Sequence, residues 1–178
     1  MKHWVALLKG VNVGGNNKVP MGKLRTALSQ QPGWGAVRSY IASGNLVFEA
    51  DGDAATLGAT IEQVIAENYG VTAPALVLTE SALRRALTSR PVEPTEGKLL
   101  HGFFPLGAVT IDWEAYETLR VPSETVTEGE GVIWLHTPEG FGRSKLAGKF
   151  DKVVKSGSVT ARNLNTLRAL VEMLDDID

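Results

Sequence analysis

The chain has 178 residues, of which 43% are apolar and 21% charged, and its formal net charge is −2. This composition is typical of a globular protein with a sizeable core, and the slightly acidic balance argues against a general polyanion binder. The absence of cysteine excludes disulfides and thiol chemistry, and no apolar stretch approaches the ~20 residues of a membrane span, so we expect a cytoplasmic protein without a membrane partner.

The first 80 residues predict elements in the order β-α-β-β-α-β, the split βαβ pattern of ferredoxin-like folds. Pro20 suits the first turn of a helix, and Gly44 lies in a tight hairpin signal between two strands. Asp53 is a suitable N-cap for the second helix, and Gly70 is a suitable stop. The predicted elements span residues 4–8, 21–30, 37–42, 46–49, from the Asp53 cap to residue 69, and 75–78.

The second half predicts a related β-α-β-β-α arrangement with an extra C-terminal helix. The predicted elements are a helix from the Thr79 cap to residue 89, a strand at 99–104, a short helix at 111–119, a hairpin of 125–128 and 132–137, a helix at 142–154, and a final helix capped by Thr160. We therefore predict an α+β protein with two sheet-containing subdomains, 1–80 and 81–178. Within the second half, the loop over residues 91–97 is the best candidate for a subdomain junction.

The loop between the first strand and the first helix is unusually polar. It contains three glycines, together with Lys9, Asn12, Asn16, Asn17 and Lys18. Glycines let backbone amides approach a ligand, and lysines near a helix N-terminus favour anions. These five residues are therefore candidate ligand-binding residues for a negatively charged group.

Basic residues are concentrated at the two ends of the chain. Residues 1–48 contain six bases and no carboxylate, and residues 140–168 contain seven bases against Asp151 alone. We predict that the two segments converge in space and form one positive face that attracts an anionic partner. In the alternative, each segment is a solvated helix face whose bases pair with acids from the middle of the chain.

Two C-terminal segments add candidate binding residues. Arg143, Ser144 and Lys145 are predicted in the first turn of a helix, where cations oppose the helix dipole unless an anion lies nearby. Arg162 and Asn163 are predicted to offer hydrogen-bond donors at the N-terminus of the last helix. The alternative is ordinary capping with a structural pair between an arginine and a carboxylate.

Motifs for catalysis, metals and cofactors are absent from the sequence. It has no HExxH, CxxC or EF-hand pattern, no Gly-x-Ser-x-Gly elbow, no Walker spacing and no Gly-x-Gly-x-x-Gly. His3, His101 and His136 are isolated in predicted strands, where a structural role is the more common one. We therefore expect no metal and no cofactor.

Five segments stand out in order along nearly the whole chain: LLKGVNVGG at residues 7–15, KVPM at 18–21, YIASGNLVF at 40–48, GRSKL at 142–146 and TARNLNT at 160–166. Together they resemble one bacterial family, the domain of unknown function 1697. The resemblance implies a cytoplasmic α+β protein. It implies no reaction, substrate or catalytic residue.

Three functional hypotheses remain open at the level of sequence. The first is a binding protein for a phosphate-bearing ligand, either a nucleotide or a nucleic-acid end. The second is an enzyme that acts on a small anionic substrate in the same basic pocket, with Lys9 or Lys145 as its reactive group. The third is a protein-interaction module whose basic face binds an acidic partner, although the sequence identifies no particular protein.

Overall fold

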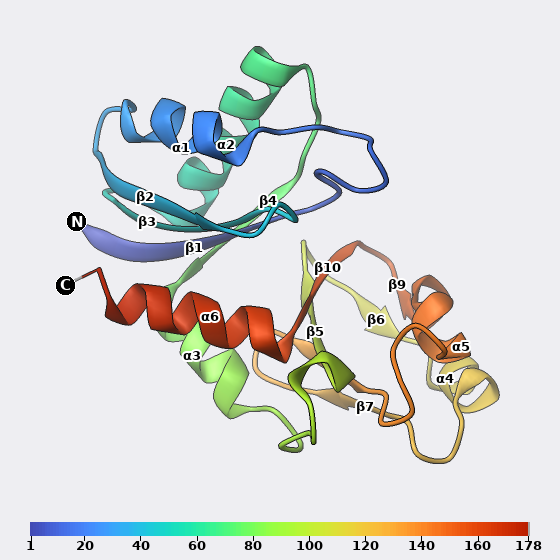
Figure 1. Cartoon of the computed structure of the whole chain (residues 1–178). Coiled ribbons are helices and arrows are strands. Elements are labelled where there is room, and N and C mark those ends of the chain that lie inside the picture. The colour runs from blue at the N-terminus through green and yellow to red at the C-terminus, as the bar shows by residue number, and fades with distance from the viewer. Residues whose placement is uncertain (178) are drawn as a thin grey trace. The chain divides into compact units, whose positions relative to one another are not determined.

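The computed structural model describes residues 1–177, which form two compact units (Figure 1). The first unit contains Met1–Arg84 and the segment that begins at Ala169, and the second contains Arg85–Arg168. The chain crosses between the units inside two helices, α3 (Glu80–Thr88) and α6 (Leu164–Asp175). No helix among residues 1–177 is long and apolar enough to cross a membrane.

The first unit has the predicted β-α-β-β-α-β order. Its elements are β1 (Lys2–Leu8), α1 (Met21–Ser29), β2 (Trp34–Tyr40), β3 (Asn45–Ala50), α2 (Ala54–Tyr69) and β4 (Ala75–Thr79). The four strands form an antiparallel sheet in the order β2-β3-β1-β4, which is the ferredoxin-like arrangement. The Asp53 side chain accepts a hydrogen bond from the Thr56 amide, and Gly70 ends α2 with a φ of 63°, as the sequence predicts.

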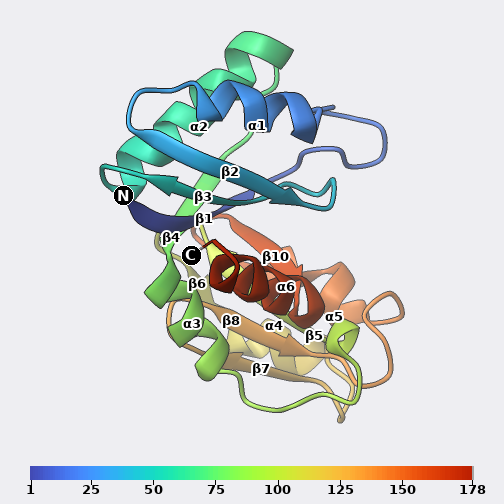
Figure 2. The same ribbon diagram turned by 60° about the vertical axis from the view of Figure 1, so that its left-hand side comes forward.

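The core of the first unit lies between the sheet and its two helices, which cover the same face (Figures 1 and 2). The core residues from the sheet are Trp4, Ala6, Leu8, Leu46, Phe48 and Ala50, and those from the helices include Leu24, Leu28, Leu57, Ile61 and Ile65. Val5, Leu7 and Val47, which alternate with these residues, are also buried. Burial on both faces explains why β1 is a continuous apolar run rather than an alternating one.

The second unit is built on an antiparallel sheet in the order β10-β5-β8-β7. Its elements are η1 (Gly97–Leu99), β5 (Leu100–Pro105), β6 (Thr110–Ile111), α4 (Trp113–Leu119), β7 (Thr125–Glu128), β8 (Ile133–His136), α5 (Lys145–Gly148), η2 (Phe150–Lys152), β9 (Val154–Lys155) and β10 (Val159–Asn163). Tyr116, Leu146 and Phe150 pack with Phe103 and Leu135 of the sheet. This cluster joins α4, α5 and η2 to one face of the sheet. The structure thus confirms the predicted α+β class with two sheet-containing parts.

The helix predicted over residues 142–154 is wrong. Only one α-helical turn forms, α5, followed by the short η2 and then by β9. Lys149 has a φ of −120° and a ψ of 28°, which interrupts the helix directly after Gly148. The apolar residues Leu146, Phe150, Val153 and Val154 had suggested one helix face, but they fill a single cluster from three short elements.

The start of the last helix was also predicted wrongly. Thr160 is not a cap, because residues 159–163 form the strand β10, in which Thr160 pairs with Phe104 and Asn163 with His101. Thr160 and Arg162 are buried while their neighbours are half-buried, which is the alternation of a strand. The cap is Asn163, whose Oδ1 accepts a hydrogen bond from the Thr166 amide at 2.9 Å.

The division into an N-terminal subdomain of residues 1–80 and a C-terminal subdomain of residues 81–178 stays a prediction.

Candidate functional site

Asn12 holds the polar loop between β1 and α1 in place. Its Oδ1 accepts from the Val19 amide at 2.8 Å, and its Nδ2 donates to the carbonyls of Val19 at 2.9 Å and Ala42 at 2.7 Å. Asn17 donates from Nδ2 to the Gly10 carbonyl at 3.1 Å, and its own carbonyl accepts from the Asn12 amide at 3.0 Å. These bonds fix the loop to itself and to the β2–β3 turn.

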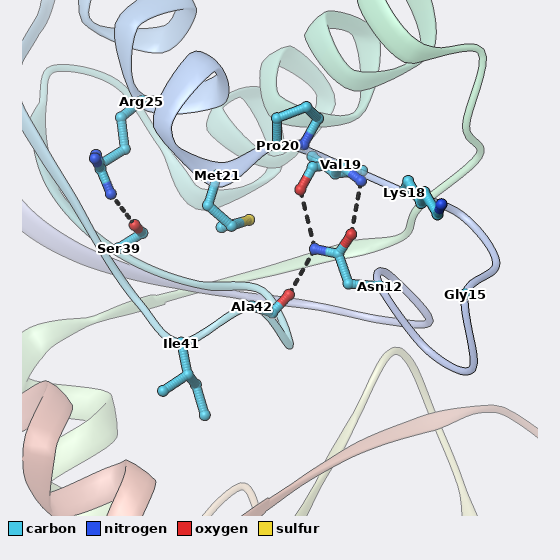
Figure 3. A pocket seen from close by; sticks show the side chains of 10 residues that line it. All are labelled: Asn12, Gly15, Lys18, Val19, Pro20, Met21, Arg25, Ser39, Ile41 and Ala42. Atoms are coloured by element: carbon cyan, nitrogen blue, oxygen red, sulfur yellow. Dashed lines mark hydrogen bonds between the residues drawn. The ribbon is translucent and has the colours of Figure 1, made fainter.

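A pocket of about 670 Å³ lies between this loop, α1 and the end of β2 (Figure 3). We call it the loop pocket. Its apolar lining consists mainly of Val19, Pro20, Met21, Ile41 and Ala42. Its polar lining consists of Asn12, Lys18, Arg25 and Ser39. Lys18 and Arg25 lie on opposite sides of the apolar residues in Figure 3, so a bound molecule would have a cation at either end.

The charged residues that line the loop pocket are all basic. None of its lining residues is a carboxylate, and residues 1–48 contain none. The helix α1 begins beside the pocket at Met21, where no side chain caps its N-terminus and no acidic residue lies in its first turn. The first amide groups of a helix lack partners within the helix and carry the positive end of its dipole. The pocket therefore combines two cations with an uncapped helix N-terminus.

Ile41, which lines the loop pocket, has an unusual backbone. Its φ is 51°, and the residue is 54% exposed. A β-branched residue in the left-handed region is strained, and an exposed one gains little from burial to offset that strain. Strain of this kind is concentrated at binding sites, where surrounding structure holds it in place.

The structure places the five predicted loop residues differently. Asn12 and Lys18 line the loop pocket, whereas Lys9, Asn16 and Asn17 do not. The sequence analysis missed Arg25, Ser39 and Ile41, because they are separated from the loop along the chain. The sequence does contain a signal for two of them. Arg25 is one of the six bases of the acid-free segment, and Ile41 lies in the hairpin segment that carries the family resemblance.

A second pocket, of about 430 Å³, lies in the second unit between η1, β5 and the segment before α5. Its side-chain lining includes Lys98, Leu99, His101, Phe141, Arg143 and Asn163. Of the predicted residues, Arg143 and Asn163 are brought together here. Ser144 instead caps α5 by accepting from the Ala147 amide at 3.0 Å, and Lys145 is exposed outside the pocket.

Arg162 is not at a helix N-terminus, as the sequence analysis had placed it, but in the strand β10. Its guanidinium is buried and donates from Nη1 to Thr160 Oγ1 at 2.7 Å and to the Ala161 carbonyl at 2.8 Å. Burial lowers its pKa to about 10, because removal from water disfavours the charged form. The residue remains protonated at neutral pH.

The sequence over residues 1–134 matches the family described as "Protein of unknown function (DUF1697)". The chain belongs to this family. A solved structure of similar fold is that of the conserved bacterial protein SP0830 from Streptococcus pneumoniae, with a TM-score of 0.77 and 26% sequence identity. The match covers 97% of this chain and 98% of the pneumococcal one, so both units have counterparts in that protein. No curated protein matches the chain.

The matched family region contains every residue of the loop pocket. Arg143 and Asn163 of the second pocket lie beyond it. The loop of residues 9–20 and the segment 143–145 belong to different units, and their convergence stays a prediction. Among residues 1–177, no group of three or more His, Cys, Asp or Glu side chains is placed to hold a metal ion.

Proposed function

We propose that this protein binds a phosphate-bearing small molecule of nucleotide size in the loop pocket. The observation that carries the proposal is the combination of Lys18, Arg25 and the uncapped start of α1 around a pocket without a carboxylate. A phosphate group accepts hydrogen bonds from both kinds of cation and from helix amides.

The apolar lining favours a ligand that has a flat or apolar portion in addition to its phosphate. Met21, Val19 and Ile41 offer contact area to a flat or apolar portion, and a free inorganic ion would leave it unused. A volume of about 670 Å³ is within the range of small-molecule sites and exceeds the need of an ion. A nucleotide has both parts, an anionic end and a flat ring.

The hydrogen bonds of Asn12 support binding by keeping the pocket preformed. Its side-chain amide joins Val19 to Ala42, so it ties the loop wall of the pocket to the β2–β3 turn. A preformed site loses less conformational entropy when a ligand binds. Asn12 would thus position the pocket wall, whereas Lys18 or Arg25, the cation at the end where the phosphate lies, would contact that phosphate.

Calorimetric titration at constant ionic strength tests the proposal with AMP, adenosine and inorganic phosphate as probes. We expect AMP to bind more tightly than either part alone. The double variant Lys18→Ala, Arg25→Ala should weaken AMP binding at least about tenfold, because each charged hydrogen bond contributes ~1.5–3 kcal/mol. Lys23→Ala is the matched control, since Lys23 is an exposed cation of the same helix outside the pocket.

Two results would overturn the proposal: no saturable AMP binding by the wild type, or equal losses in the double variant and in Lys23→Ala. A 5′-phosphorylated oligonucleotide that binds more tightly than AMP would assign the site to a nucleic-acid end. The lining residues include no histidine, aspartate or glutamate for proton transfer, so we expect binding without turnover. Conversion of AMP, followed by NMR, would favour the enzyme hypothesis instead.

A further inference from the structure

The second pocket has four polar side chains, and each of them has a donor to offer. Lys98 and Arg143 are exposed cations, and neither can accept a hydrogen bond. The Lys98 ammonium lies 3.8 Å from the carboxylate of Glu96, which is a long ion pair. Glu96 does not line the pocket. Within residues 1–177, Arg143 makes no ion pair.

Asn163 adds a hydrogen-bond donor, because its other side-chain group is already used in the helix cap. Its Oδ1 is the acceptor that caps α6, bonded to the Thr166 amide. Because an asparagine side chain carries one carbonyl oxygen and one NH₂ group, the group left for the pocket is the NH₂. The cap thus removes the ambiguity between oxygen and nitrogen that otherwise affects asparagine side chains.

His101 supplies the fourth donor. Its ring stacks on Phe141 with centroids 3.8 Å apart, and its Nδ1 is buried without a hydrogen-bond partner. Burial lowers its pKa to about 4, so the ring is neutral at pH 7 and carries one proton. Nδ1 has no partner in either tautomer, and because buried N–H groups without a partner are rarer than buried acceptors without one, we expect the proton on Nε2. Nε2–H is then the accessible polar group of the ring.

Two of the backbone acceptors beside the pocket are already used. The Leu99 carbonyl accepts from the Thr137 amide at 2.9 Å, and the Phe141 carbonyl accepts from the Ser144 amide at 3.2 Å. The pocket therefore gathers two cations and two neutral donors, with no carboxylate among its lining residues. A ligand that could only donate hydrogen bonds would find few acceptors there.

We propose that the second pocket is a separate oxyanion site, in which Lys98, Arg143, Asn163 and His101 bind the carboxylate or phosphate group of a small ligand. The two cations neutralise the charge, and the Asn163 NH₂ and the His101 Nε2–H orient the oxygens. Phe141 contacts the rest of the ligand. The site lies wholly within the second unit and does not depend on the loop pocket.

Titration followed by ¹H–¹⁵N NMR of the histidine rings tests this proposal, with inorganic phosphate and acetate as probes at constant ionic strength. We expect His101 to be the Nε2–H tautomer in the absence of a probe. At least one of the two anions should shift its ring signals in a saturable manner. The stronger of the two identifies the preferred oxyanion.

Four variants locate the effect. Arg143→Ala and Lys98→Ala should each weaken the binding of that anion at least about tenfold. Lys145→Ala, an exposed cation two residues from Arg143 but outside the pocket, should change it less than twofold. The Lys18→Ala, Arg25→Ala variant should also leave the His101 response intact, which separates this site from the loop pocket.

Three results would overturn the proposal: an Nδ1–H tautomer, no response of His101 to either anion, or equal weakening by Lys145→Ala and Arg143→Ala. Melting curves by circular dichroism check that the variants fold. Lys98 and Arg143 are exposed, so little change in melting temperature is expected.

Discussion

At the scale of single residues, three similar asparagines of one loop have different roles. Asn12 has a φ of 54° and uses both ends of its side chain on backbone groups. Asn17 also has a positive φ and bonds the Gly10 carbonyl, whereas Asn16 is exposed. Composition alone could not separate them, because the distinction depends on which backbone groups the folded loop leaves without partners.

We predict that Asn12→Ala destabilises the protein by ~1–3 kcal/mol, because it removes three hydrogen bonds, to the Val19 amide and to the carbonyls of Val19 and Ala42. Asn16→Ala is the control and should cost less than ~0.5 kcal/mol. Urea unfolding of the two variants gives the difference in free energy. Equal costs would mean that the side-chain bonds of Asn12 contribute nothing specific.

His101 is predicted to make stability depend on pH. Its pKa is about 4 in the folded protein and ordinarily 6.5, so between these values the unfolded chain binds the extra proton. This contribution is complete above pH 6.5 and is lost as the pH falls toward 4, by up to ~3 kcal/mol. His101→Phe should remove this part of the pH dependence, since phenylalanine does not titrate and can still stack on Phe141.

The measurement is the difference in unfolding free energy between wild type and His101→Phe at several pH values from 7 to 4.5. Other groups, such as His136, titrate in both proteins and cancel in that difference. A difference that stays constant with pH would show that His101 is not buried as a neutral ring.

At the scale of elements, the sequence predicted well where the signals were local. The sequence predicted the six elements from β1 to β4 in the right order. For α2, the signals are local because Asp53 and Gly70 begin and end the helix to which they belong. Predictions failed where apolar residues from separate short elements meet in one cluster, as between Leu146 and Val154. Thr160 suits both a cap and a strand, and only its pairing with Phe104 on a distant strand decides between them.

Gly44, in the β2–β3 turn, is required both by the turn itself and by close packing against residues elsewhere in the chain. Gly44 has a φ of 95°, and a Cβ there would lie 2.6 Å from Val11 Cγ2 and 2.7 Å from Leu8 Cβ. Gly14 has a φ of 57° but open space around it. We predict that Gly44→Ala costs ~2–4 kcal/mol, from backbone strain and overpacking, whereas Gly14→Ala costs only the strain, ~1–2 kcal/mol.

Thermal unfolding of the two glycine variants measures this difference. Gly44→Ala should also weaken binding in the loop pocket, because Ala42 of the same turn lines it. A Gly44→Ala protein as stable as Gly14→Ala would mean that Leu8 and Val11 move aside at little cost.

At the scale of the whole molecule, the two candidate sites each lie within one unit, and the two units share α3 and α6. The sequence identified only some of the residues that line these two pockets. A run of basic residues marks a region, but the lining of a pocket is chosen by strands and turns that pack there. Lys98 and His101 line the second pocket beside Arg143, although neither lies in the basic segment of residues 140–168.

The shared helices predict that the two units unfold together. Each of α3 and α6 has residues in both units, so unfolding of one unit removes hydrogen-bonded turns from a helix of the other. We expect one transition, coincident by far-UV circular dichroism and by the fluorescence of variants that retain a single tryptophan, either Trp34 of the first unit or Trp134 of the second. AMP at ~100 times its dissociation constant should then raise the free energy of unfolding of both units by roughly 2.7 kcal/mol, although its proposed pocket lies in the first. Native-state hydrogen exchange of amides in β3 and β8 measures this unit by unit. Protection that rises in β3 alone would show that the units unfold separately and would contradict this prediction.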